Sequence, residues 1–169
     1  MQKIICSLIL IVGCHLHIFS DNLEDVRTQF PTLNEIQQID MLLEKINNNY
    51  SPIAIAYKGA LTIIKAKFAP SPLKKFVFFK EGKSMIEQAV SLSPKNIEIR
   101  YLRVLMQEKS PIFLNYKENI KEDISFVVNQ IVEAELTLKV KYKIISNLVE
   151  ANLISYEQKL HLFNRLNKP

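Results

Sequence analysis

The chain has 169 residues with a net charge of +5, and 48% of its residues are hydrophobic. This length suits one domain with one sizeable core, and the modest, dispersed positive charge excludes the basic stripe of a nucleic-acid-binding protein. Both cysteines, Cys6 and Cys14, precede residue 21, so a disulfide, a thiolate nucleophile and a cysteine-ligated metal site are excluded from the remaining chain.

Residues 1–20 have the layout of a secretory signal peptide. Lys3 precedes an apolar run from Ile4 to Val12, and the small residue Ser20 stands before a cleavage site that would leave Asp21 first. A membrane-spanning helix needs about 20 apolar residues, which is longer than this run. The pattern predicts an exported protein, either periplasmic or secreted.

A lipoprotein signal that ends before Cys14 is the alternative interpretation. Ile11-Val12-Gly13-Cys14 resembles a bacterial lipobox, in which diacylation of the cysteine anchors the mature protein to a membrane. The apolar stretch from Leu16 to Phe19 is unlike the polar tether expected after such a cysteine. Lipidation of Cys14 stays an alternative to cleavage after Ser20, and it would make the protein a membrane-anchored lipoprotein.

Residues 21–169 are expected to fold as one all-α domain, an antiparallel array of about seven to eight helices with repeat-like hairpins. Gly59 and Gly82 are the only glycines of this part, whereas a β-sheet protein of similar length needs more glycines for its turns. The helices are predicted at Leu23 to Gln29, Leu33 to Asn47, Ile53 to Phe68, Leu73 to Leu92, Ile97 to Glu108, Tyr116 to Val132, Leu138 to Ala151 and Tyr156 to Leu166.

Prolines and polar caps account for the ends of these helices. Asn96 is a good N-cap, and Ser155 with Gln158 predicts a capping box for the last helix. The other breaks lie at Pro31, Pro52, the Pro70-Ser71-Pro72 turn, Pro94 and Pro111.

The segment 136–144 also carries a strand-like pattern. Its apolar residues alternate with Thr137 and three lysines in period two, which is typical of a half-buried strand. No second segment of this kind is available to pair with it, and Ile144 to Val149 continue at helical spacing. We expect a helix here, with a strand as the alternative.

The segment from Phe79 to Leu105 predicts a helix, a sharp stop and a second helix. It resembles a tetratricopeptide repeat, in which two helices carry small residues where they cross and end at a proline. Gly59, Gly82, Ala89 and Pro94 would fill those places. The two glycines lie further apart than a repeat of about 34 residues would place them, so we expect one repeat-like hairpin and not a solenoid.

A second resemblance covers most of the chain after the signal. It is carried by Tyr57-Lys58-Gly59-Ala60, Phe79 to Ala89, Ser93 to Arg103 and Pro111 to Asp123. These segments resemble small exported bacterial proteins of uncharacterised function, and the resemblance implies export and a compact helical fold but no particular activity.

The predicted helix from Ile97 to Glu108 is apolar on nearly every face. Its only polar stripe consists of Asn96, Arg100, Arg103 and Gln107. Guanidinium groups on a mostly buried helix need carboxylate partners. The candidate partners are Asp123, Glu122 and Glu87, with hydroxyl groups from Tyr57 and Tyr116.

Two interpretations of Arg100 and Arg103 follow. In the first, the arginines belong to a structural ion-pair network. In the second, they form a site for a carboxylate or phosphate together with Tyr57, Tyr116 and Asp123. A polar pocket open to solvent would favour the second interpretation, and arginines covered by acidic side chains would favour the first.

Lysines and phenylalanines are mixed in the stretch from Leu73 to Lys80. Phe76 and Phe79 are expected to share one helix face and Phe78 to point elsewhere, so at least one of them is expected to be exposed. Core packing, with lysine stems that reach water, is the simpler interpretation. Contact of these phenylalanines with a membrane surface or a partner is the alternative.

The other charged groups give weaker signals. The lysines between Lys139 and Lys143 lie among glutamates and predict a solvated face. His161 is the only histidine after residue 20 and is expected at the surface, so no metal or cofactor site is predicted. Glu133 and Glu135 lack the neighbours that would favour general acid-base catalysis.

These observations predict a non-enzymatic, exported helical interaction module or scaffold that needs no metal or cofactor. Its expected partner is a protein and not a nucleic acid, with membrane contact through a lipid anchor or the patch of Phe76, Phe78 and Phe79. The rival prediction is a periplasmic binding protein or enzyme for a small carboxylate or phosphate, with Arg100 and Arg103 between helices as its anion-binding residues.

Overall fold

The computed structural model describes residues 22–168, and these residues form helices without any strand. The predicted all-α array is therefore confirmed. After a first helix at residues 22–29, the elements follow in the order α2 (Ile36–Lys45), α3 (Pro52–Lys65), η1 (Ala66–Phe68), α4 (Pro72–Leu92), α5 (Ile97–Lys109), η2 (Ile112–Leu114), α6 (Ile120–Gln130), α7 (Leu138–Glu150) and α8 (Tyr156–Leu166).

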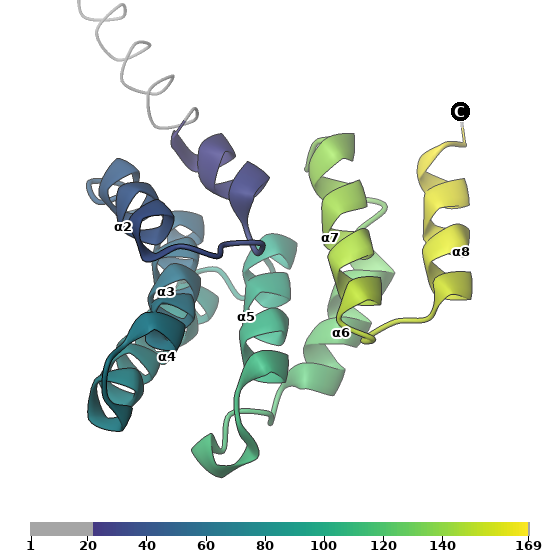
Figure 1. The fold of residues 1–169 in the computed structure, drawn as a ribbon. Helices are drawn as coiled ribbons and strands as arrows, with labels where there is room; N and C mark the ends of the chain where they lie inside the picture. Colours follow the sequence, from purple (N-terminus) through teal and green to yellow (C-terminus); the bar gives the residue numbers. More distant parts are fainter. Residues whose placement is uncertain (1–21, 169) are drawn as a thin grey trace, which may run out of the picture.

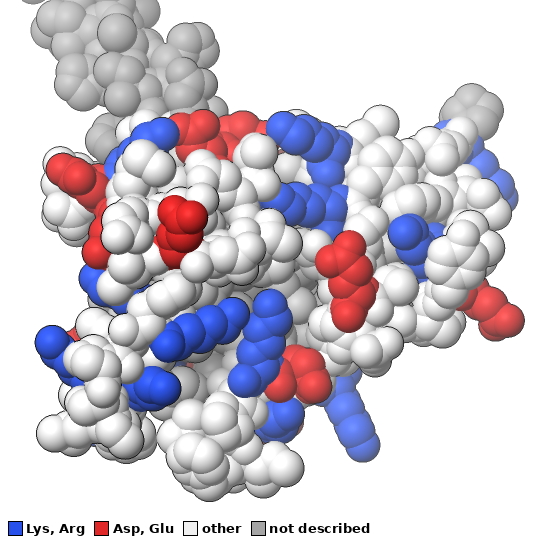
Figure 2. Space-filling view, viewed as in Figure 1, with Lys and Arg blue, Asp and Glu red and all other residues white. Residues whose placement is uncertain are grey.

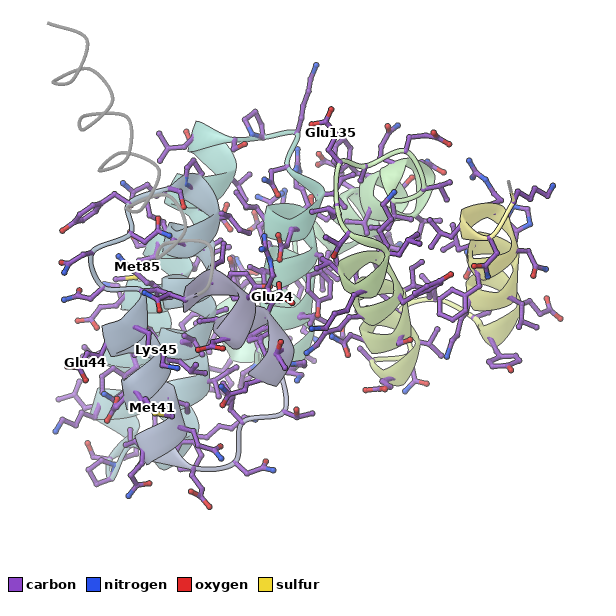
Figure 3. All side chains as sticks on the ribbon, turned by 90° about the horizontal axis from the view of Figure 1, so that it is seen from above. Glu24, Met41, Glu44, Lys45, Met85 and Glu135 are labelled. Atoms are coloured by element: carbon purple, nitrogen blue, oxygen red, sulfur yellow. The ribbon has the colours of Figure 1, made fainter. Side chains whose placement is uncertain are left out.

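The helices lie in a row that follows the chain (Figure 1). α3 and α4 form one end, α5 lies beside them, α6 and α7 come next, and α8 ends the row. The view from above shows the same row and labels Lys45 of α2, whose Nζ lies 2.5 Å from Asp25 of the first helix (Figure 3). The first helix is also tied to α5 and α7, because Arg27 bonds Glu98 and Lys143 donates to the Arg27 carbonyl.

Local signals set most helix boundaries as predicted. Asn96 caps α5 by accepting a hydrogen bond from the backbone N–H of Ile99 at 3.0 Å. Ser155 and Gln158 form the expected capping box of α8. Serine caps also precede the prolines that begin α3 and α4. Each cap satisfies backbone N–H groups that the first turn of a helix leaves without a partner.

The strand-like segment 136–144 is helical. Thr137 caps α7 by accepting from the backbone N–H of Val140, and α7 then buries Ile144 and Leu148 on one face. The segment therefore follows the helical spacing of its later apolar residues and not the period-two alternation of its first residues, because the later residues pack into the core with the neighbouring helices.

Two predicted helix starts are wrong. α2 begins at Ile36, because Leu33 is buried from an extended segment before the helix. α6 begins at Ile120, because Asn115 has a left-handed backbone with a φ of 49° and Tyr116 is buried ahead of the helix. The short turn η2 that precedes Asn115 is not predicted by the sequence pattern.

α3 and α4 cross at two glycines. A Cβ atom on Gly59 would lie 2.6 Å from the carbonyl oxygen of Gly82 and 2.9 Å from Cγ1 of Ile86. A Cβ atom on Gly82 would meet the carbonyl oxygen of Gly59 still more closely. The predicted close approach at Gly59 and Gly82 is confirmed, and only the absence of side chains permits it.

α5 is the central helix of the array. It contacts α3, α4, α6 and α7, and it buries Ile99, Leu102 and Met106. Because neighbours enclose it on most sides, two of its charged residues are buried as well: Glu98 is 2% exposed and Arg103 is 4% exposed. Buried charges need partners, and α5 is therefore where the charge clusters of the protein form.

Candidate functional site

Arg103 and Asp123 form the centre of a buried charge cluster between α5 and α6. The Arg103 guanidinium donates from Nε to Asp123 Oδ2 at 2.6 Å and from Nη2 to Asp123 Oδ1 at 2.9 Å. This is the bidentate arrangement that matches a guanidinium to a carboxylate. The Asp123 side chain is fully buried, and only 5% of the Arg103 side chain is exposed.

Arg100 and Glu87 extend this cluster toward the surface. Arg100 Nη1 lies 2.5 Å from Asp123 Oδ1 and 3.2 Å from Glu122 Oε1, and its Nε donates to a backbone carbonyl at 2.8 Å. Glu87 reaches in from α4 and accepts from Arg103 Nη1 at 2.9 Å. The cluster therefore joins α4, α5 and α6.

Tyr116 joins the cluster through Glu87. Its hydroxyl donates to Glu87 Oε1 at 2.7 Å, and its ring packs edge-on against Phe79 with the ring centres 5.8 Å apart. Burial, followed by the charge of Glu87, raises the pKa of Tyr116 above its ordinary value. The tyrosine therefore acts here as a neutral hydrogen-bond donor.

Tyr57 lies in a second cluster on another face of α5 and does not join the arginine stripe. Its hydroxyl donates to Glu98 Oε1 at 2.8 Å, while Arg27 binds both oxygens of Glu98 at 2.7 Å. Burial, followed by the charge of Glu98, raises the pKa of Tyr57. The sequence pattern does not reveal this cluster, although a glutamate in the first turn of an apolar helix is a weak signal for it.

Internal carboxylates occupy the positions around Arg103 where a ligand anion would bind. Its Nε, Nη1 and Nη2 atoms all donate to Asp123 or Glu87. A ligand carboxylate would have to displace Asp123 from Arg103 and would leave this fully buried carboxylate with Arg100 as its remaining cation, which is unfavourable. The geometry is that of a structural ion-pair network.

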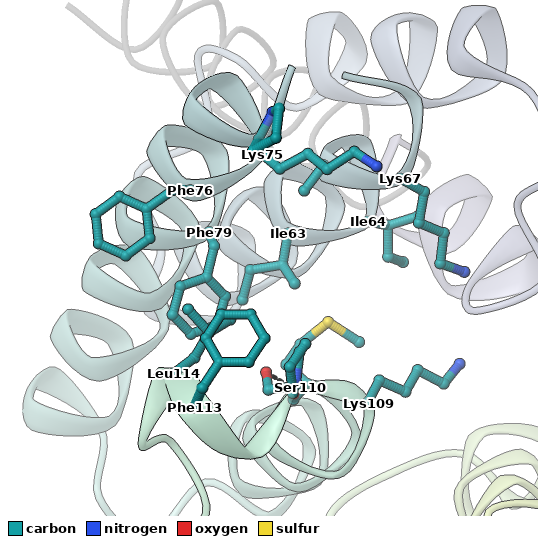
Figure 4. A pocket seen from close by; sticks show the side chains of 14 residues that line it. Ile63, Ile64, Lys67, Lys75, Phe76, Phe79, Lys109, Ser110, Phe113 and Leu114 are labelled. Carbon is teal, nitrogen blue, oxygen red and sulfur yellow. Dashed lines mark hydrogen bonds between the residues drawn. The ribbon is translucent and has the colours of Figure 1, made fainter. Parts of the chain in front are cut away.

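An apolar groove adjoins this network between α3, α4, the end of α5 and η2. We call it the α4–η2 groove. Its cavity has a volume of about 410 Å³, and Figure 4 shows the side chains that line it. Its apolar lining includes Ile63, Phe76, Phe79, Met106, Phe113 and Leu114.

Three lysines complete the lining of the α4–η2 groove. Their ammonium groups lie on the side opposite the phenylalanine rings (Figure 4), and among the described residues no acidic side chain lines the groove. Figure 2 shows basic side chains around a hollow in the lower part of the view, with an acidic side chain beside them. The lysines are Lys67, Lys75 and Lys109.

The phenylalanines of α4 divide between the core and the surface, but Phe76 and Phe79, which the spacing predicts on one face, fall on different sides of this division. Phe79 is 6% exposed, whereas Phe76 is 47% exposed at the edge of the α4–η2 groove. Phe78 points elsewhere, and the Nζ atom of Lys65 lies 5.5 Å from its ring centre. One exposed phenylalanine is thus confirmed, and it borders a cavity.

The predicted solvated lysine face on α7 is wrong for two of its members. Lys141 is 8% exposed. The Nζ atoms of Lys141 and Lys143 each donate to a backbone carbonyl at 2.6 Å, on Val132 and Arg27 respectively. Their long stems let them reach carbonyl groups that end neighbouring segments, a role that charge patterning alone does not indicate.

His161 is exposed on α8, and Cys14 with the predicted signal segment lies outside the described residues. Between residues 22 and 168, no group of three metal-ligating side chains is found, and no helix has the length and apolar character needed to cross a membrane.

No protein-family model matches the chain, and no match was found among curated proteins or solved structures.

Proposed function

We propose that this chain is an exported, non-enzymatic binding module, in which the Arg103–Asp123 cluster is part of the scaffold and the α4–η2 groove is the binding surface. One observation supports it above the others: the groove offers about 410 Å³ of apolar space, while the donors of Arg103 are already occupied. Apolar cavities of about 300–1,000 Å³ are the usual form of small-ligand sites.

The helices around the groove are joined by close contacts. The glycine crossing joins α3 to α4, and the arginine cluster joins α4 to α5 and α6. A site on fixed helices loses little conformational entropy when it binds. The charge cluster, as part of the scaffold, therefore helps to keep the helices in place whose side chains line the groove.

A protein partner that docks over the rim of the groove is a second candidate. Ile112 and Phe113 of η2 are 85% and 84% exposed, and Leu73 of α4 is 74% exposed. Neighbouring exposed apolar side chains of this size are typical of a protein contact. A photoreactive benzoylphenylalanine in place of Phe113 should then capture a protein that the same probe in place of Tyr156 on α8 does not capture.

A carboxylate or phosphate site on Arg100 and Arg103, with or without catalysis, has less support. The nearest acidic groups, Asp123 and Glu87, neutralise these arginines internally. Burial of the cluster also leaves a ligand little access to the guanidinium groups, since 5% of the Arg103 side chain is exposed.

Nile red, a neutral dye that fluoresces in apolar surroundings, tests the groove as a binding surface. Ala66 lines the cavity, so Ala66→Phe should fill it and lower the fluorescence of the bound dye. Phe113→Ser should also lower it, whereas Tyr156→Ser, which removes an aromatic ring that is 63% exposed on α8, should not. Equal dye binding by Ala66→Phe and the unmodified chain, with both folded by circular dichroism, would contradict the proposal.

A further inference from the structure

The α4–η2 groove has an apolar end and a basic end. Phe76 and Phe113 stand at one end, whereas the side chains of Lys67, Lys75 and Lys109 reach the other (Figure 4). The lining between the two ends is mostly apolar, and the hydroxyl of its one serine, Ser110, donates to the Met106 carbonyl. A molecule that fills the groove along its length therefore needs an apolar body and a negatively charged end.

Among the described residues, the lysines at the basic end have no carboxylate within ion-pair distance, although the charge of Glu150 acts on Lys109 from further away. Within residues 22–168, none of Lys67, Lys75 and Lys109 forms an ion pair with a carboxylate, whereas Lys45 and Lys65 pair with aspartates. Burial, followed by the positive charge of Lys67, lowers the pKa of Lys109. An anion between these ammonium groups would reduce their mutual repulsion.

We propose that the α4–η2 groove binds a long-chain aliphatic carboxylate, with its hydrocarbon chain against Phe76, Phe79 and Phe113 and its carboxylate at Lys67 and Lys109. This inference rests on the proposed function, because it names the ligand class of the same groove. Burial of methylene groups supplies the affinity, and the lysines supply the preference for a negative end.

The volume of the groove, about 410 Å³, suits a single acyl chain. A membrane surface or a partner helix would contact the exposed rim, whereas a small ligand would occupy the cavity itself. An acyl chain has the width of one methylene group and adapts to an irregular apolar lining. The charge at one end of the groove then fixes the direction in which the chain lies.

The test compares dodecanoate with dodecan-1-ol by isothermal titration calorimetry on the full chain. The two ligands share one hydrocarbon chain and differ in charge, so the ratio of their affinities reports on the lysines. Lys67→Gln/Lys109→Gln should weaken dodecanoate binding about tenfold and leave dodecan-1-ol binding within about twofold. As a matched control, Lys95→Gln/Lys121→Gln removes the same charge from exposed lysines outside the groove lining and should change neither affinity beyond about twofold.

Distinct outcomes separate this inference from the proposed function. Equal binding of dodecanoate and dodecan-1-ol, or equal losses in the two lysine double variants, would overturn the carboxylate assignment but leave the groove as an apolar binding surface. Unchanged binding of both ligands by Ala66→Phe would contradict the groove itself. Binding of phosphatidylglycerol vesicles, or self-association, in the absence of dodecanoate binding would assign the groove to a membrane surface or a second copy and would also overturn the inference.

Discussion

The carbonyl oxygen of Gly59 lies where a side chain on Gly82 would begin, so α3 and α4 touch through their backbones at these two residues. This contact fixes one wall of the α4–η2 groove, because Ile63 of α3 and Phe79 of α4 both line the cavity. The stability of the crossing and the shape of the groove therefore depend on the same pair of glycines.

Gly82→Ala is expected to destabilise the protein by about 1–3 kcal/mol through overpacking. The new Cβ would press against a backbone carbonyl, which cannot rotate away, and this cost exceeds the gain of about 1 kcal/mol in helix propensity. Urea unfolding followed by circular dichroism measures the change. Ser84→Ala, at an exposed position of the same helix, is the control and should be neutral or slightly stabilising. An unchanged midpoint for Gly82→Ala would show that the two helices separate without cost.

Arg103→Met is expected to cost about 3–5 kcal/mol, because it leaves Asp123 fully buried without its bidentate partner. The control Arg165→Met removes an exposed partner that lies 3.5 Å from Glu133 and should change the free energy of unfolding by less than about 0.5 kcal/mol. Thermal melts with and without a panel of phosphates and carboxylates measure both effects. A variant that melts as high as the unmodified chain and loses a ligand-induced shift would instead identify an anion site.

Stability is expected to fall as the pH rises above about 10, where tyrosines of the unfolded chain lose their protons. Burial raises the pKa of Tyr57, Tyr101 and Tyr116 in the folded protein. The unfolded state then binds fewer protons than the folded state, so the free energy of unfolding decreases by up to about 1.4 kcal/mol per pH unit for each of these tyrosines.

Tyr116→Phe should remove one of these contributions and make the pH dependence less steep between about pH 10 and 12. Tyr50→Phe is the control, because the Tyr50 side chain is 76% exposed and should not alter the slope. Urea unfolding at a series of pH values gives the slopes. The same slope for Tyr116→Phe and the unmodified chain would contradict the assignment of Tyr116 as a buried neutral donor.

The exported protein is expected to begin at Asp21, because the signal layout places a small residue, Ser20, before the cleavage site. Mass spectrometry of the mature N-terminus, on protein recovered from the cells that produce it, checks this expectation. Recovery in a detergent fraction with a diacylated Cys14 would identify a lipoprotein instead.

Helix positions follow largely from the sequence because capping and termination act within one turn of the chain. Asn96 and Ser155 accept hydrogen bonds from residues three positions later, so their role is visible in a short window. The start of α6 is not visible in this way, since the burial of Tyr116 ahead of the helix depends on its contacts with Glu87 and Phe79 of α4.

The arginine cluster was accessible from the sequence in part. The helical period places Arg100 and Arg103 on one stripe, and the cost of a buried guanidinium points to carboxylates such as Asp123 as partners. The sequence does not show that Tyr116, and not Tyr57, joins this cluster. The Tyr116 hydroxyl donates to Glu87 of the cluster, whereas the Tyr57 hydroxyl donates to Glu98, and this difference depends on how the helices pack around α5.

The all-α character, most helix limits and the glycine contact can be predicted from the sequence, because they follow from local hydrogen bonding, side-chain size and helical period. The way in which surfaces distant in the chain meet is visible only in the folded protein. Glu98 pairs with Arg27 across 71 positions, and the α4–η2 groove combines side chains of α3, α4, α5 and η2. Such partners depend on the packing of whole helices against one another, and no local pattern of residues encodes that packing.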